Sequence, residues 1–180
     1  MKTKSTEHRI LLAAQTLMGS KGYAGVSMSA IADEVGVTKA SLYYFFKSKQ
    51  DIYIRVLGDI IDEVTKHYSV NNDEKVTKAS LAKKIVGSLQ YGIKKGSIIL
   101  SPEIDSLPTD SERMQDIEHA AMIMQKTVEQ YVKRAGAKNP EFAAQALIDM
   151  THAYVKRAMQ HIPQMSQKKF AEQLTTLITH

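Results

Sequence analysis

The chain has 180 residues, of which 43% are hydrophobic and 24% are charged. This composition is typical of a folded globular protein and not of a disordered or low-complexity one. The chain contains no cysteine, which excludes disulfides, thiolate nucleophiles and cysteine-ligated zinc. Its first residues are basic, but no apolar signal-peptide core follows, and no apolar run approaches the roughly 20 residues of a membrane span. We therefore expect a soluble cytoplasmic protein.

Positive charge is concentrated at the N-terminal end. Residues 1–50 contain seven lysines and arginines against three acidic residues, a net charge of +4, whereas the whole chain carries +5. Residues 51–180 are therefore almost neutral. This distribution favours contact between the N-terminal part and a polyanion such as DNA. A chance imbalance in a short window is the alternative explanation of the charge taken alone.

Apolar residues recur with the period of an α-helix throughout, and no segment shows the alternation typical of a strand. We therefore expect an all-α fold. The first helix is predicted over Thr6–Lys21, with Gly22 as its C-terminal stop. Ser48 is predicted to cap a long helix from Lys49 to about Tyr68.

Two short helices are predicted between these long ones. Ser27 and Thr38 are placed as their N-caps, and Gly36 ends the first of them. Leu42, Phe45 and Phe46 are expected to form the buried side of the second short helix.

The later helices are expected at about Val76–Lys95, Ser111–Ala135, Pro140–Ile162 and Ser166–Thr179. The segment Ser97–Asp110 contains two prolines and permits at most one short helix. Gly87 and Gly92 lie inside a predicted helix, where each glycine costs about 1 kcal/mol relative to alanine. Such positions indicate either a close helix crossing or space for a ligand.

Residues Ile31–Leu42 have the pattern of a helix-turn-helix, the motif whose second helix reads the DNA major groove. Ala32 is small where two helices would cross, and Gly36 permits the sharp turn between them. With Leu42 buried, polar and aromatic residues remain near the exposed start of the second helix.

This region resembles the N-terminal domain of the tetracycline-repressor (TetR) family. The resemblance is carried by Ser27–Ala32 and Gly36–Lys49, together with Ile10-Leu11, Ala13-Ala14 and Gly22-Tyr23. It covers about the first 55 residues and does not extend as sequence into the remainder.

The resemblance implies a helix-turn-helix DNA-binding domain over residues 1–48 and a helical effector-binding and dimerisation domain over residues 49–180. It also implies a homodimer, formed through 140–162 and 166–179, that binds a palindromic operator as a repressor and is released by a small effector. The predicted helix 140–162 supports dimerisation independently, because a single polar stripe leaves most of its circumference apolar.

Carried over by position, seven side chains are expected to contact DNA. Those expected at bases or adjacent phosphates are Thr38, Lys39, Ser41 and Tyr43, and those expected at the DNA backbone are Ser27, Tyr44 and Lys49. Each has a purely structural alternative. The two hydroxyl residues at helix starts can be caps alone, the tyrosines can be core residues, and the lysines can be solvated.

An apolar effector is expected among the helices of the second domain. The candidate lining residues are Tyr91, His119, Met122, Met124, Met150 and Tyr154. Ordinary core packing is the alternative for each of them. A regulator without an effector, or an architectural DNA-binding protein whose second domain only dimerises, is the alternative function.

A small helical enzyme is the remaining alternative. No two of the six histidines have the i, i+4 spacing of a helical metal pair, and no glycine-rich phosphate loop or nucleophile elbow is present. Asp149 and His152 share a helix face, which an ion-paired surface stripe explains better than catalysis. We therefore expect no enzymatic activity, metal or cofactor.

Overall fold

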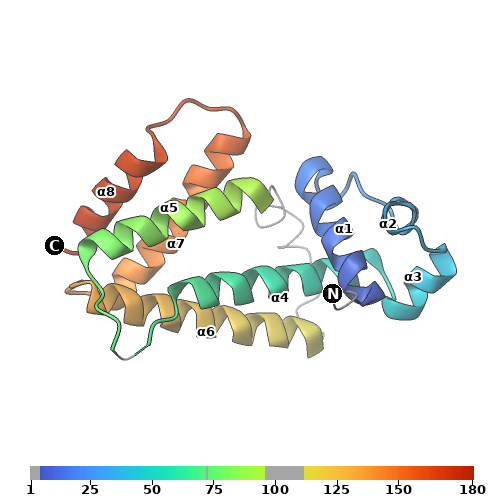
Figure 1. Ribbon diagram of the computed structural model, residues 1–180, viewed down its shortest axis with the longest axis horizontal. Helices are drawn as coiled ribbons and strands as arrows, with labels where there is room; N and C mark the ends of the chain where they lie inside the picture. The colour runs from blue at the N-terminus through green and yellow to red at the C-terminus, as the bar shows by residue number, and fades with distance from the viewer. Residues whose placement is uncertain (1–4, 72, 96–111) are drawn as a thin grey trace. The chain divides into compact units, whose positions relative to one another are not determined.

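The computed structural model describes residues 5–71, 73–95 and 112–180, and within these ranges it contains eight α-helices and no strand (Figure 1). The expected all-α fold is confirmed. The helices are α1 (Thr6–Lys21), α2 (Met28–Val35), α3 (Lys39–Phe45), α4 (Lys49–Tyr68), α5 (Lys78–Lys95), α6 (Glu112–Arg134), α7 (Pro140–Met159) and α8 (Gln167–Ile178). None of the helices in the described part of the chain combines the length and apolarity needed to cross a membrane.

The described residues form two compact units. The first contains α1, α2, α3 and the part of α4 up to Ile60, together with Lys95 and the start of α6 up to Ile117. The second contains the remainder of α4 from Ile61, most of α5, α6 from Glu118, and both α7 and α8. The functional division expected at residue 48 stays a prediction.

Helix boundaries follow the local hydrogen-bonding chemistry. α1 and α4 begin and end where the sequence predicts. α5 begins at Lys78, two residues later than expected, because Thr77 and Ser80 cap it reciprocally, with N–H donated to the opposite Oγ at 2.8 and 3.1 Å.

α7 ends earlier than expected, at Met159 and not Ile162. His161 adopts a positive φ of 54°, which takes the chain out of the helix. The predicted helix start at Ser111 and the proline-containing segment 97–110 lie outside the described residues.

The two interior glycines of α5 are sites of close helix crossing. A Cβ on Gly87 would lie 2.9 Å from Cε1 of His67 on α4, and a Cβ on Gly92 would lie 2.8 Å from Cγ2 of Val155 on α7. Both distances are below van der Waals contact. The neighbouring helix explains these glycines, so they need no ligand.

Aromatic residues fill the interior of the second unit. The buried rings of Tyr68 on α4 and Tyr131 on α6 meet edge to face, with centroids 5.6 Å apart. Ser88 Oγ donates a hydrogen bond of 3.0 Å to the Tyr68 hydroxyl. Burial raises the pKa of Tyr68, so this phenol stays neutral and serves as a packed, hydrogen-bonded core group.

Candidate nucleic-acid interface

The turn between α2 and α3 is defined by a glycine in the left-handed region. Gly36 has φ 74° and ψ 38°, and its N–H and that of Val37 donate to the last carbonyls of α2, with Val37 N to Ala32 O at 3.0 Å. A side chain at this φ would be strained. Gly36 therefore ends α2 as predicted and lets α3 leave at an angle.

Both short helices begin at the predicted caps. Ser27 Oγ accepts from Ala30 N at 3.1 Å, and Thr38 Oγ1 accepts from Ser41 N at 3.0 Å. Thr38 Oγ1 also lies 2.8 Å from Ser41 Oγ. The predicted capping roles are confirmed, whereas the DNA contacts expected of these hydroxyls stay predictions.

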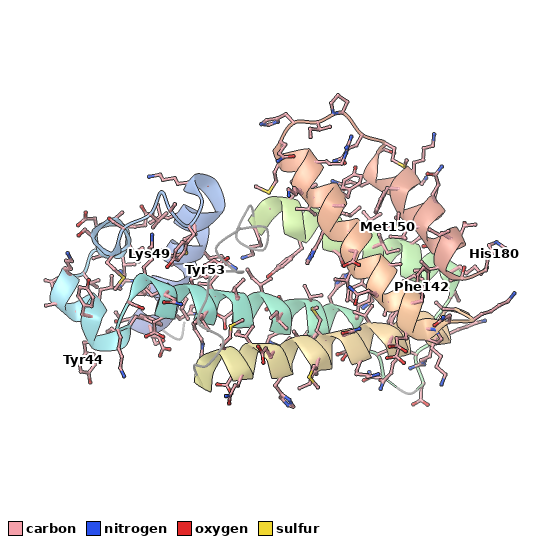
Figure 2. The ribbon with its side chains drawn as sticks, turned by 180° about the vertical axis from the view of Figure 1, so that it is seen from behind. Tyr44, Lys49, Tyr53, Phe142, Met150 and His180 are labelled. Carbon is pink, nitrogen blue, oxygen red and sulfur yellow. The ribbon has the colours of Figure 1, made fainter. Side chains whose placement is uncertain are left out.

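α3 has a single buried residue, Leu42. Tyr43 and Tyr44 are 46% and 86% exposed, and Lys39 and Ser41 are exposed as well. Figure 2 shows Tyr44 at the outer side of α3, pointing away from the neighbouring helices. Four of the seven side chains expected to contact DNA therefore lie on a helix that is open to solvent around most of its circumference, whereas Ser27 and Thr38 precede α2 and α3 and Lys49 begins α4.

The expectation that Phe45 joins the buried side of this helix is wrong. Phe45 is 37% exposed, and its ring meets that of Tyr44 edge to face at 5.2 Å. Phe46 takes the core position because it lies just past the end of α3, where extended backbone at φ −137° turns its side chain inward. The exposed aromatic surface of α3 is therefore one residue larger than the sequence predicts.

Lys49 is held by the protein itself. Its Nζ donates a hydrogen bond of 2.9 Å to the backbone oxygen of Tyr23 and lies 4.1 Å from the centroid of the Tyr23 ring. The Tyr23 ring in turn packs against Tyr53, with centroids 4.8 Å apart. The expected contact of Lys49 with the DNA backbone is not tested by this arrangement.

Arg9 is a contributor that the sequence does not single out. Its Nη2 donates to the backbone oxygen of Val35, the last residue of α2. A cation at a helix C-terminus is favourable because it faces the negative end of the helix dipole. Arg9 thereby ties α1 to the end of α2, a pairing across 26 residues for which the sequence carries no signal.

The candidate effector-binding residues have different environments. Tyr91 and Met124 are partly buried, and Tyr154 is buried with its hydroxyl donating to Met165 O at 2.7 Å. His119, Met122 and Met150 are exposed. The assignment of these residues to an effector site stays a prediction. No cluster of three or more His, Asp or Glu side chains able to hold a metal ion occurs in the described ranges.

Comparison with known proteins agrees with this geometry. Residues 10–56 match the family model for bacterial regulatory proteins of the tetR family. An HTH-type transcriptional regulator from the lacX 3' region of Lactococcus lactis subsp. lactis is 34% identical over 64 residues, which are 36% of this chain and 33% of the relative. IcaR, the negative transcriptional regulator of the biofilm operon icaADBC in Staphylococcus aureus, is 49% identical over 45 residues, 25% of this chain and 24% of IcaR.

The fold is shared over almost the whole chain. A TetR transcriptional regulator from Legionella pneumophila superposes with a TM-score of 0.77 at 21% identity, covering 99% of this chain and 97% of that structure. In contrast, the sequence matches cover about a third of the length of the Lactococcus regulator and about a quarter of that of IcaR. Residues 10–56 thus match the tetR family of bacterial regulatory proteins, and the chain shares the fold of a TetR transcriptional regulator.

Proposed function

We propose that this protein is a transcriptional repressor that binds a palindromic operator as a homodimer and is released from it by a small, largely apolar molecule. The observation that carries the proposal is the exposure of α3, which is anchored by Leu42 alone and presents Lys39, Ser41 and Tyr43 to solvent. A helix of this kind at the end of a helix-turn-helix inserts into the major groove. Acting on a bacterial chromosome, the protein works in the cytoplasm.

The roles within the interface follow from side-chain chemistry. Lys39 and Ser41 supply hydrogen bonds to base edges, and the exposed ring of Tyr43 covers a thymine methyl group. The Ser27 and Thr38 hydroxyls can each accept from a backbone N–H as caps and still donate their own hydrogen to a phosphate or base. Tyr44 reaches the phosphate backbone beside the groove.

Dimerisation through α7 and α8 is supported by apolar side chains that this chain leaves uncovered. On α7, Phe142 is 66% exposed and Met150 is also exposed, a little over two helical turns away. On α8, Leu177 is 62% exposed. Figure 2 locates Phe142 and Met150 on α7. A second copy related by a two-fold axis would cover these side chains and place two α3 helices on successive turns of DNA, about 34–36 Å apart.

Release by a ligand requires that the ligand bind more tightly to a conformation in which the distance between the two α3 helices of the dimer no longer fits the operator. The partly buried Tyr91 and Met124 support an apolar site within the second unit, because methionine and tyrosine adapt their packing to an apolar guest. Their aromatic and thioether groups favour an uncharged molecule.

The experiment begins with recovery and sequencing of genomic DNA fragments retained by the purified protein. Binding of a recovered palindromic duplex is then compared with binding of a scrambled duplex of equal length and charge. We expect preferential binding to the palindrome and, in sedimentation, a species of twice 20.1 kDa. Equal affinity for both duplexes would refute specific operator binding, and a strict monomer would refute the dimer.

Ligand response is tested on the same operator complex. A small molecule that binds the protein and weakens the complex supports release. A molecule that binds among the helices of the second unit without changing operator affinity would favour the effector-independent repressor or architectural protein.

A further inference from the structure

We propose that Lys49 is a positioning residue that clasps the two ends of the helix-turn-helix together and so holds α3 in its DNA-reading orientation. The inference rests on the proposed DNA-binding function. It assigns the Lys49 ammonium primarily to Tyr23 and not to a DNA phosphate.

The position of Lys49 is unfavourable for a lysine unless tertiary contacts compensate. It is the first residue of α4, whose N-cap Ser48 accepts a hydrogen bond from Asp51 N at 3.1 Å. The positive end of the helix dipole repels a cation there. Contacts with Tyr23 offset this repulsion, because the Lys49 Nζ lies 2.9 Å from the Tyr23 backbone oxygen and 4.1 Å from the centroid of the Tyr23 ring.

The contact closes a loop around the whole motif. Tyr23 lies in the connector between α1 and α2, Lys49 begins α4, and the 26-residue separation between them contains both α2 and α3. The clasp therefore fixes the entry and exit of the helix-turn-helix relative to each other. Lys49 and Tyr53 both belong to the first part of α4 (Figure 2), and the Tyr53 ring packs against the Tyr23 ring.

The orientation of α3 depends on contacts made by the neighbouring segments, because α3 itself buries few side chains. Leu42 is its single buried residue, and only Phe46, Lys47 and Ser48 separate its end from α4. Asp51 fixes this short connection by accepting from Lys47 N at 3.0 Å. The orientation of α3 is thus set by where α4 begins, and the Lys49–Tyr23 contact sets the start of α4.

The test compares the full-length wild type with Lys49→Met, Tyr23→Leu and the double variant. We expect Lys49→Met, which removes both the cation–π contact and the charged hydrogen bond, to weaken binding of the recovered operator duplex by about tenfold. Tyr23→Leu removes the ring but keeps the backbone carbonyl, so it should weaken binding by less. The double variant should bind within about twofold of Lys49→Met, because Tyr23→Leu removes part of a contact that Lys49→Met already abolishes. The slope of log affinity against log salt should not change, since no phosphate contact is lost.

Two variants provide matched controls. Tyr23→Phe keeps the ring and the carbonyl that Lys49 contacts, so Lys49→Met should weaken binding of this variant as much as it weakens binding of the wild type. Lys47→Met removes an exposed lysine of the same connection, and its effect should add to that of Tyr23→Leu because Lys47 takes no part in the clasp. Helix content by circular dichroism identifies any variant that fails to fold. For such a variant, coupling is judged from Lys49→Gln and Tyr23→Met, which preserve more of the packed volume.

A direct phosphate contact by Lys49 gives a different pattern. The salt slope would then become shallower by about one unit per lost contact for Lys49→Met but not for Tyr23→Leu, and the two effects would add. That result would overturn the clasp while leaving the proposed function intact. A wild type that prefers no recovered duplex over a scrambled one would instead refute the proposed function itself.

Discussion

Replacement of Gly92 by alanine tests the close crossing of α5 and α7. Alanine at a helix interior is favoured over glycine by about 1 kcal/mol. The added Cβ, however, would lie 2.8 Å from Cγ2 and 3.4 Å from Cγ1 of Val155. Overpacking of this kind costs about 1–3 kcal/mol, so Gly92→Ala should lower the free energy of unfolding by roughly 0–2 kcal/mol.

The sign should reverse when Val155 is shortened. Val155→Ala removes both methyl carbons that oppose position 92, and by itself costs roughly 1.6 kcal/mol at 0.8 kcal/mol per carbon. In that background Gly92→Ala should stabilise by up to about 1 kcal/mol, because the propensity gain is no longer offset. The pair should therefore show a coupling of about 1–3 kcal/mol.

Urea unfolding of the four proteins measures this cycle, at one protein concentration because dimerisation would add to the apparent stability. Gly58→Ala in α4 is the matched control, since its Cβ would meet only the flexible Cδ1 of Ile117 at 3.2 Å and should be tolerated. Equal destabilisation by Gly92→Ala in both backgrounds would show that Val155 is not what excludes a side chain there.

Three further substitutions test the proposed interface and dimer. Lys39→Ala should lose about 1–3 kcal/mol of operator binding and relax the preference at one base position of each half-site, measured by titration of single-base operator variants; a uniform loss over all sequences would contradict base reading. Tyr44→Ala should weaken operator binding while the free energy of unfolding stays within about 0.5 kcal/mol, because the side chain is 86% exposed; a large stability loss would place the ring in the core. Leu177→Glu should produce monomers in sedimentation and weaken binding of the palindrome, since a carboxylate would be buried at the two-fold contact; an intact dimer would show that α8 lies outside the interface.

Local features of this protein could be predicted from its sequence. The caps at Ser27 and Thr38 and the stop at Gly36 depend on hydrogen bonds within four residues and on the φ that glycine permits. The helical spacing of the apolar residues can be read from the local sequence alone. The first and last residues of α1 and α4 could therefore be predicted correctly. The motif that contains these features also located the candidate DNA-reading helix.

Contacts between distant residues were decided by the tertiary structure. The sequence shows apolar residues at 45 and 46 but not which one turns inward, because that depends on where α3 stops against the core. It shows a lysine at 49 but not that its ammonium rests on Tyr23, 26 residues away. The glycines at 87 and 92 likewise indicate that another group lies close by, but the sequence does not show that this group is His67 or Val155. Such pairings form only when packing brings distant helices together. The identity of a side chain limits which contacts it can make, but the tertiary structure determines which residues lie close enough to be contacted.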